Sequence, residues 1–387
     1  MNQLSLFWRR LFTTRRHAGS GDNNTLGRLI RQGSAYYLAR DGRARPPMTI
    51  FLTVNGHCNL RCRMCDIGLQ NRESMFYHNL RGESGSDFPI DRYRSLIDEV
   101  ASFKPLLGVT TTEPLLYKPM FEAVDYARHR GLDTNITTNG LRVGERIDEI
   151  MDSGLYRLSV SLDGPPAIHD HMRGLAGCYD RVVDGLRQVA ERKRARGLDR
   201  PHLMVNSFIT DENHAHIVDF VAGLPLQDID IVNIKLMAFF TREMVERHNA
   251  VFGDRYPATS TCFPDDFNPA NLDLDAVCRQ VAEVKARFGD KVAFHFEPDA
   301  NMLRRYYYQP AEFMDGTKCV VPWFVAQITN DGDLAVLTRC YDLRLGNIME
   351  QPFLDVWNGE KMRGFRRDLR KHGRFPGCAR CDGVLYR

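Results

Sequence analysis

Segments with strand and helix patterns alternate along residues 48–240, and this alternation restricts the fold more than any other feature of the 387-residue chain. Such alternation indicates βαβ units around a mainly parallel sheet. Predicted strands cover residues 49–55, 106–112, 133–138, 157–163, 203–210 and 229–237. Predicted helices cover residues 91–103, 120–130, 146–153, 179–196 and 216–222. Six βα units are fewer than the eight of a closed TIM barrel, so we expect an α/β fold with an open, partial (β/α)6 TIM-like barrel.

The regions before residue 48 and after residue 240 have other patterns. Residues 1–47 form a basic extension and linker, and residues 241–315 form a linker or insertion with a helix near 274–288 and a strand near 292–297. Residues 316–387 are rich in cysteine and turns, and their Asn-Asp-Gly-Asp sequence at 330–333 lies between apolar runs, which predicts a hairpin. We interpret this last region as a second, small domain.

Charge and composition exclude several classes of protein. The 52 Lys and Arg residues against 49 Asp and Glu leave a net charge of +3, which excludes a strongly basic nucleic-acid-binding surface. The hydrophobic content of 43% excludes bulk disorder. No apolar run reaches the roughly 20 residues of a membrane span, and no secretory signal opens the chain, so we expect a cytoplasmic protein.

Residues 1–21 contain no acidic side chain and form a basic amphipathic stretch. Arginines alternate there with apolar residues at helical spacing: Leu4, Phe7, Trp8, Arg9, Arg10, Leu11, Phe12, Arg15 and Arg16. Such a stretch can pack on the folded domain, lie on a membrane surface or target an organelle. We favour packing slightly over peripheral membrane contact.

Three of the ten cysteines, Cys58, Cys62 and Cys65, follow the first predicted strand directly. Cysteines so close together in one loop can share a metal centre, and thiolates favour iron–sulfur clusters, zinc or copper(I). A four-iron cluster held by three cysteines leaves one iron open to a small molecule. The alternative is a structural zinc site with His57 as its fourth ligand, which we consider the weaker interpretation.

The spacing of these cysteines resembles the CxxxCxxC signature of the radical S-adenosylmethionine (radical SAM) superfamily. The resemblance implies that Cys58, Cys62 and Cys65 bind a 4Fe-4S cluster whose open iron is chelated by the amine and carboxylate of SAM. Thr111-Thr112-Glu113-Pro114, after the second predicted strand, is similar to the Gly-Gly-Glu-Pro motif that receives the SAM amino group. Both glycines are replaced by threonine, which either alters this loop or adds hydroxyl groups to the contact.

Polar residues after the next strands also match the superfamily pattern. Asn139, in Thr-Thr-Asn-Gly at 137–140, and Ser159, Ser161 and Asp163 resemble its ribose and carboxylate contacts. Arg173 matches an arginine that often approaches the cofactor carboxylate in this branch. The alternative for each residue alone is a turn or a strand cap. Their shared place at the carboxyl ends of strands, where a barrel builds its site, favours the functional interpretation.

A second cysteine group lies near the C-terminus and consists of Cys319, Cys340, Cys378 and Cys381. Four thiolates fit a closed zinc site or a fully ligated iron–sulfur cluster. The surrounding sequence resembles the SPASM or shortened twitch domain of radical SAM enzymes. Because four cysteines suffice for one cluster, the resemblance implies a twitch-like domain with a single auxiliary 4Fe-4S cluster.

The other chemically notable residues have simpler interpretations. We interpret Cys178, Cys262 and Cys278 as small apolar side chains rather than catalytic thiols. The tyrosines at 306–308 face either a substrate or a seam between domains. The basic C-terminal helix around Arg366 is most simply a solvated face.

The resemblance implies that SAM is cleaved reductively to a 5′-deoxyadenosyl radical, which abstracts hydrogen from an unactivated C–H bond. It also implies an external one-electron donor such as flavodoxin or ferredoxin. We expect an oxidoreductase acting on a small molecule (a sugar, nucleoside or lipid), because a leader-binding domain of roughly 80 residues does not fit before Met48. A radical SAM peptide maturase is the alternative, and a zinc-containing binding protein without activity is an alternative of another class.

Overall fold

The computed structural model describes residues 25–81, 85–260, 271–296, 299–314, 318–336 and 341–381, without the side chains of residues 25–31. The basic stretch at 1–21, Cys262 and Cys340 therefore lie outside the described residues.

The described strands form one sheet in the order β7-β6-β5-β4-β3-β2-β1-β8-β9. Their bounds are β1 Thr49–Leu52, β2 Leu106–Val109, β3 Thr134–Thr138, β4 Arg157–Ser161, β5 His202–Ile209, β6 Ile231–Leu236, β7 Val292–Phe294, β8 Val325–Ile328 and β9 Leu334–Ala335. Strands β1 to β8 pair in parallel, and β9 is antiparallel to β8. The predicted α/β fold with a partial barrel built from β1 to β6 is confirmed.

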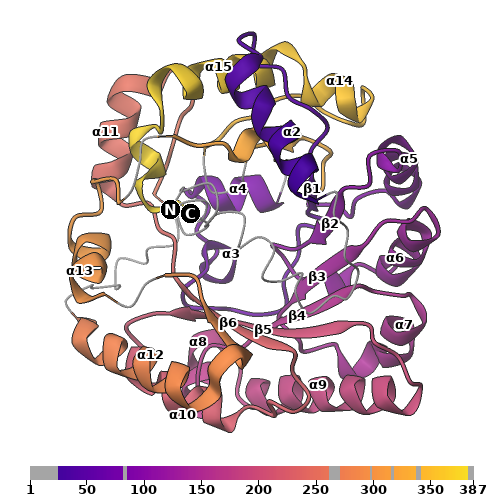
Figure 1. Cartoon of the computed structure of the whole chain (residues 1–387), viewed down its shortest axis with the longest axis vertical. Coiled ribbons are helices and arrows are strands. Elements are labelled where there is room, and N and C mark those ends of the chain that lie inside the picture. Colours follow the sequence, from indigo (N-terminus) through magenta and orange to yellow (C-terminus); the bar gives the residue numbers. More distant parts are fainter. Residues whose placement is uncertain are drawn as a thin grey trace.

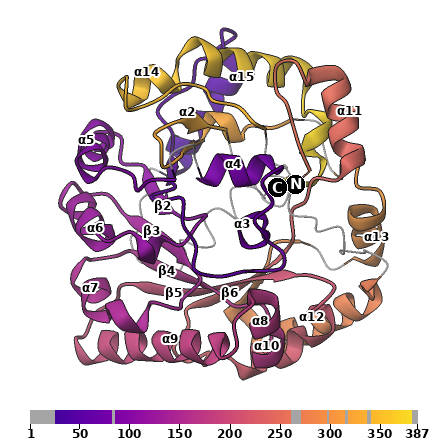
Figure 2. The ribbon, with the colours of Figure 1, turned by 180° about the vertical axis from the view of Figure 1, so that it is seen from behind.

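Helices surround this sheet and cover its outer face (Figure 1). They are α2 Thr25–Leu38, α3 Asp66–Leu69, α4 Met75–Arg81, α5 Ile90–Val100, α6 Met120–His129, α7 Ile147–Asp152, α8 Pro166–Arg173, α9 Cys178–Ala195, α10 Ile217–Gly223, α11 Arg242–Phe252, α12 Leu274–Phe288, α13 Ala300–Tyr308, α14 Phe353–Trp357 and α15 Glu360–His372. Short 3-10 turns are η1 Pro114–Leu116, η2 Gly144–Arg146, η3 His214–His216, η5 Gly289–Lys291, η6 Val321–Trp323 and η7 Pro376–Arg380. The views from both sides place α3 and α4 inside the ring of outer elements (Figure 2).

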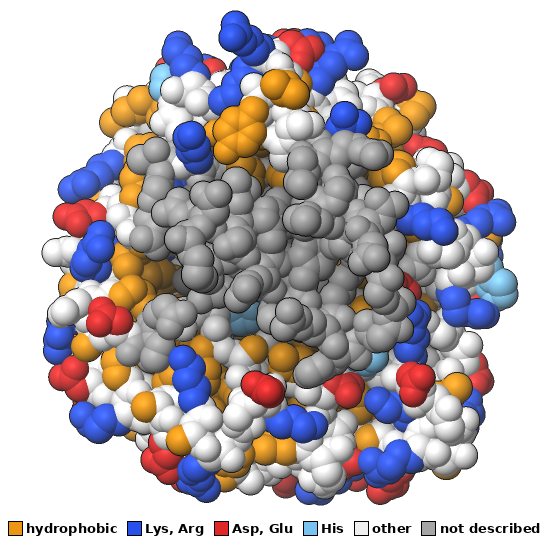
Figure 3. All heavy atoms as spheres, in the orientation of Figure 1, with side chains coloured by type: hydrophobic (Ala, Val, Ile, Leu, Met, Phe, Trp, Pro, Cys, Tyr) orange, Lys and Arg blue, Asp and Glu red, His pale blue; other side chains and the backbone are white. Residues whose placement is uncertain are grey.

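The hydrophobic core lies between the sheet and the outer helices. Alternate strand residues such as Ile50, Leu107, Leu158 and Val232 are completely buried there. Because side chains alternate along a strand, the intervening residues face the inside of the barrel. On the face shown in Figure 3, basic and acidic side chains are intermixed over the described part of the surface, as the small net charge predicts.

The C-terminal region shares the barrel sheet. β8 pairs with β1 over four residues, from Thr49 opposite Val325 to Leu52 opposite Ile328. The predicted hairpin at 330–333 is confirmed, because β8 and β9 are antiparallel and Gly332 at their turn has φ +86°. The strand predicted near 292–297 also joins the sheet as β7, beside β6.

The segment before β1 contains a helix that we did not predict. Helix α2 packs on the C-terminal region: the ring of Tyr36 meets that of Trp323 edge-on at 4.8 Å, and Gln32 Nε2 donates to the Trp323 carbonyl at 2.6 Å. Helix α11, within the region predicted as linker, was also missed. Both helices are amphipathic, and their apolar faces have partners that lie far away in the sequence.

Helix α15 is not the solvated face that we expected. Arg366 is completely buried, and its guanidinium donates to the carbonyls of Pro322 at 2.8 Å, Trp357 at 3.0 Å and Gly42 at 3.3 Å. It also lies 4.1 Å from the centre of the Trp357 ring. Burial lowers the pKa of Arg366 to about 9, so it remains charged at neutral pH. One arginine thus joins three separate segments of the chain.

Within the described residues, no helix is long and apolar enough to cross a lipid bilayer.

Replacing Arg366 by Met should lower the free energy of unfolding by about 3 kcal/mol, because three buried carbonyls lose their donor. The loss can be measured by urea denaturation. Arg187→Met, at an exposed position of α9, is the control and should change stability by less than about 0.5 kcal/mol. Equal stability of the two variants would contradict the role of Arg366 as a structural link.

Candidate active site

The loop between β1 and α3 carries Cys58, Cys62 and Cys65, and α3 lies inside the ring of outer elements (Figure 2). All three are free thiols, with Cys62 buried and the other two half-buried. Burial raises the pKa of Cys58 to about 12, and it also raises that of Cys62. A buried thiol ionises when a positive charge is close, and iron bound at this loop supplies such a charge. Three soft donors on one loop therefore fit an iron–sulfur cluster.

Two glycines let neighbouring helices approach this loop. A Cβ atom on Gly68 of α3 would lie only 2.4 Å from the Cys62 carbonyl oxygen. Gly174, which ends α8 with φ +70°, would place a Cβ atom 2.7 Å from the Arg61 carbonyl oxygen. The Arg63 amide donates to the Met172 carbonyl at 2.9 Å, which joins the loop to α8. The backbone around Cys62 is therefore held on two sides.

Glu113 ties the loop after β2 to neighbouring loops. Its backbone amide donates to the His57 carbonyl at 2.9 Å. Its side chain is buried and accepts hydrogen bonds from the amides of Leu115 at 2.9 Å and Asn139 at 2.8 Å and from Thr138 Oγ1 at 2.7 Å. Burial raises the pKa of Glu113, against these three hydrogen bonds, which favour its ionised form. The Glu113 carboxylate thus links the loop after β2 to the end of β3.

Thr111 keeps a backbone conformation that normally requires glycine. Its φ is +100°, which is rare for a β-branched residue. Its hydroxyl lies 2.9 Å from that of Thr53 and bonds to the Thr110 carbonyl. Thr112 Oγ1 donates to the Asn55 carbonyl at 2.8 Å. The two threonines therefore bind the loop after β1, and the glycine-like turn is kept at Thr111.

Asn139, which bonds to Glu113, and the serines of the neighbouring strand β4 are the next predicted site residues. Asn139 Nδ2 donates to Asn59 Oδ1 at 2.7 Å, and Asn59 lies between Cys58 and Cys62 in the loop. Ser159 is buried and Ser161 half-buried, and both alternate with core residues of β4. They therefore face the barrel interior. The structure brings these predicted residues to the side of the barrel where the cysteine loop lies.

A buried ion pair joins β4 to the cysteine loop. The Asp163 side chain is completely buried, and its Oδ2 accepts from both Nε, at 2.8 Å, and Nη2 of Arg173. Arg173 Nη1 in turn lies 3.8 Å from Cys62 Sγ. Burial disfavours the charge of Arg173, but Asp163 and Cys62 outweigh it and raise the pKa of Arg173. The pair therefore presents a fixed positive charge to Cys62.

Asp163 is fully engaged by protein groups in this structure. Its Oδ1 accepts from the Phe208 amide at 3.1 Å, and its own amide donates to His169 Nδ1 at 3.1 Å. Burial lowers the pKa of His169 to about 4, so this ring is neutral and can accept that bond. We expected Asp163 to contact the cofactor, and in this structure its carboxylate also positions Arg173. Nothing in the local sequence indicates this pairing.

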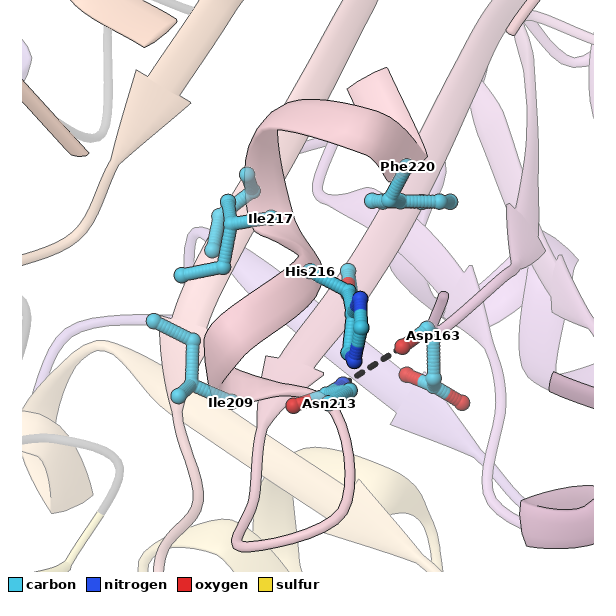
Figure 4. A pocket seen from close by; sticks show the side chains of 8 residues that line it. Asp163, Ile209, Asn213, His216, Ile217 and Phe220 are labelled. Carbon is cyan, nitrogen blue, oxygen red and sulfur yellow. Dashed lines mark hydrogen bonds between the residues drawn. The ribbon is translucent and has the colours of Figure 1, made fainter. Parts of the chain in front are cut away.

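A small pocket lies behind Asp163, between β5 and α10 (Figure 4). Asn213 lies at its floor and donates through Nδ2 to the carbonyls of Asp163 and, at 2.7 Å, Phe208. Ile217 and Phe220 of α10 supply apolar walls. Because these residues lie on the helix side of the sheet, the pocket is separate from the barrel interior.

The C-terminal cysteines that the structure describes are Cys319, Cys378 and Cys381, all free thiols. Cys378 is buried, and the Tyr341 hydroxyl lies 2.8 Å from its sulfur. Tyr341 stacks on His248 with ring centres 4.7 Å apart. Thiolates in an apolar shell with a hydroxyl neighbour fit an iron–sulfur cluster.

Arg380, inside the final Cys-x-x-Cys, anchors this loop to α13. Its guanidinium donates to five carbonyls, those of Arg305, Tyr306, Gln309, Glu312 and Ala379. The Tyr306 hydroxyl donates to the Met237 carbonyl, just after β6, at 2.8 Å. Tyr306 and Tyr307 are buried, so they form the seam between the barrel and the C-terminal region rather than a substrate face.

Replacing Thr111 by Gly should cost less stability than replacing Thr112 by Gly. Glycine at position 111 removes the strain of the positive φ, which costs about 1–3 kcal/mol. Thr112→Gly relieves no strain: it loses a buried hydrogen bond, and glycine makes the unfolded chain more flexible. Urea denaturation of both variants measures the order. A larger loss for Thr111→Gly would show that the backbone there is not strained.

Replacing Asp163 by Asn should lower the free energy of unfolding by about 3 kcal/mol, because the Arg173 charge stays buried without its counter-ion. The double variant with Arg173→Met should lose less than the two single variants together. Asp148→Asn, in an exposed pair with Arg192, is the control and should cost less than about 1 kcal/mol. Additive losses at 163 and 173 would contradict the coupling.

Sequence profiles of two families match the chain. The radical SAM superfamily matches residues 52–221, and the iron–sulfur cluster-binding SPASM domain matches residues 319–382. The AdoMet-dependent heme synthase of Methanosarcina barkeri is 25% identical over 350 residues, which cover 87% of this chain and 88% of the relative. The PqqA peptide cyclase of Xanthomonas axonopodis pv. citri is 27% identical over 84% of this chain and 77% of its own.

Solved structures show the same fold. Streptococcus suis SuiB bound to S-adenosylmethionine matches with a TM-score of 0.62 and 15% identity over 94% of this chain and 78% of its own. The profiles favour iron–sulfur clusters over zinc, and the second profile confirms the expected SPASM-type domain at the C-terminus. The chain belongs to the radical SAM superfamily, uses 4Fe-4S clusters and S-adenosylmethionine, and carries a C-terminal SPASM domain.

Proposed function

We propose that Cys58, Cys62 and Cys65 hold the SAM-binding cluster and that the enzyme abstracts hydrogen from a C–H bond of a peptide substrate, in a net oxidation. The observation that carries this proposal is the buried chain of contacts from Asp163 through Arg173 to Cys62. It places a fixed positive charge beside one thiol of the loop. Such a charge favours the thiolate that iron binding requires.

The cluster, when bound, supplies the electron that cleaves SAM to methionine and the 5′-deoxyadenosyl radical. The residues around it bind and orient the cofactor. In this proposal Arg173 attracts the SAM carboxylate. Glu113 receives the SAM ammonium through a remaining acceptor site of Oε2, which accepts from the Asn139 amide. Thr111 and Thr112 shape the same loop, and Asn139, Ser159 and Ser161 border the ribose.

We further propose that Cys319, Cys340, Cys378 and Cys381 hold one auxiliary cluster. Such a cluster, when bound, supplies an acceptor for one electron. Tyr341 follows Cys340 directly, and its hydroxyl lies 2.8 Å from the Cys378 sulfur, where it would donate to a thiolate and stabilise added negative charge at the site. Arg380 holds the Cys378–Cys381 loop against α13, whose Tyr306 bonds to the end of β6. The oxidoreductase activity and an external donor such as flavodoxin or ferredoxin belong to the same proposal.

The relatives support a peptide substrate better than the sugar, nucleoside or lipid that we expected. The PqqA peptide cyclases align over most of the chain. Two solved structures of similar fold hold bound peptides, namely SuiA in SuiB and the Cp18Cys peptide in anSMEcpe. A tetrapyrrole is the second candidate, because the heme synthase of Methanosarcina barkeri aligns over 87% of this chain and 88% of its own length.

Replacing Cys58, Cys62 and Cys65 together by Ala should abolish formation of 5′-deoxyadenosine from SAM, because no thiolates remain to hold the cluster. Iron content should fall by about four per chain, while the C-terminal cluster remains. Cys278→Ala is the control and should retain both properties. Formation of 5′-deoxyadenosine by the triple variant at the wild-type rate would refute the proposal.

The two substrate classes can be separated with the reconstituted wild-type enzyme. Optical titration with Fe-coproporphyrin III tests the tetrapyrrole, since specific binding shifts its absorption bands. Mass spectrometry of short peptides encoded beside the gene and expressed with the enzyme tests the peptide, because a net two-electron oxidation removes two hydrogens. Tight binding of Fe-coproporphyrin III, seen as an absorption shift, without any modification of the peptides would favour a tetrapyrrole substrate over a peptide substrate.

A further inference from the structure

Strands β5 and β6 present a polar face to the inside of the barrel. Val232, Ile234 and Leu236 are buried, and Ile234 lines the pocket beside α10 on the outer side of the sheet. Because side chains alternate along a strand, Asn233 and Lys235 face the barrel interior. Barrel enzymes build their sites at the carboxyl ends of such strands.

Three polar residues form a row across this interior face. Ser161, Asn206 and Asn233 are register partners on β4, β5 and β6. Asn233 Nδ2 lies 3.4 Å from Asn206 Oδ1, and His295 Nε2 lies 3.2 Å from Asn233 Oδ1. The row continues from β4 to the residue after β7. It offers neutral donors and acceptors along one level of the barrel.

Lys235 stands one level closer to the carboxyl ends of the strands. Its register partner is Phe208, whose amide donates to Asp163 Oδ1. Lys235 therefore lies two strands away from Asp163, or roughly 10 Å at the usual spacing of strands. Its side chain is half-buried, and within the described residues no hydrogen bond or ion pair reaches its ammonium group.

The acidic groups near this mouth of the barrel do not neutralise Lys235. Asp163 is paired with Arg173, and Glu212 contacts Arg63 and His171. Asp211, in the loop after β5, forms no ion pair with Lys235 within the described part of the chain. A partly desolvated ammonium group without a counter-ion attracts an anion more strongly than a solvated one does. Within the described residues, then, no carboxylate pairs with Lys235, and its ammonium group is available to an anionic group of a substrate.

We propose that Lys235 binds a carboxylate of the substrate, so that the substrate is an acidic molecule, and in the peptide case an acidic peptide. The inference rests on the proposed function, which places the SAM carboxylate beside Arg173 and Cys62. Lys235 is two strands away from the Asp163–Arg173 pair and faces the barrel interior. The part of the polar row from Asn206 to His295 then receives the neutral groups of the same substrate.

The test uses the reconstituted holoenzyme with SAM and two small probes, N-acetyl-glutamate N-methylamide and its glutamine counterpart. Their dissociation constants are measured by saturation-transfer NMR for the wild type, Lys235→Met and Lys235→Arg. We expect the wild type to prefer the glutamate probe about tenfold, since the ammonium pairs with its carboxylate. Lys235→Met should lose this preference, and Lys235→Arg should keep part of it.

Lys118→Met, at an exposed position outside the barrel interior, is the matched control and should keep the preference. A wild type without preference, or a preference unchanged in Lys235→Met, would overturn the proposal. A large rise in the SAM dissociation constant of Lys235→Met would also overturn it, because the ammonium would then serve the cofactor. Failure of the proposed function itself is seen separately, as absence of 5′-deoxyadenosine from the wild type.

Discussion

The buried pair between Asp163 and Arg173 is the interaction on which the arrangement of the site depends. Neither charge is tolerable there alone, so the pair fixes the end of β4, the C-terminus of α8 and the loop around Cys62 together. The neutral ring of His169, which also lies on α8, and the amide of Phe208 on β5 make further hydrogen bonds to Asp163. The positive charge beside Cys62 is therefore held in place before any cofactor arrives.

Buried arginines repeat this strategy with backbone carbonyls in place of carboxylates. Arg366 joins the segments around Gly42, Pro322 and Trp357, and Arg380 joins the last cysteine loop to the end of α13. Each guanidinium has several donors, so one side chain can connect several pieces of irregular backbone. The region after the barrel, which has little regular structure, is stabilised in this way.

Local patterns predicted the six βα units, the hairpin at 330–333 and the grouping of the cysteines, because periodicity and spacing are properties of short segments. They did not predict α2, whose partners near Trp323 lie almost 300 residues away. They did not reveal that Thr111 would keep a glycine-like φ, since the Thr53 hydroxyl that accompanies it comes from another strand. The burial of Arg366 was missed for the same reason: its acceptors are carbonyls, which leave no mark in the sequence.

The pairing of β8 with β1 has a consequence for the relation between the two cysteine groups. β1 leads directly into the loop of Cys58, and β8 begins six residues after Cys319, so one ladder of backbone hydrogen bonds determines how far apart the two loops lie. A parallel ladder can slip only in whole steps, and a one-residue slip would turn every side chain of the strand to the wrong face. The separation between the two cysteine loops is thus set in discrete steps of one residue pair. Evolution can change it only by inserting or deleting residues outside the strands.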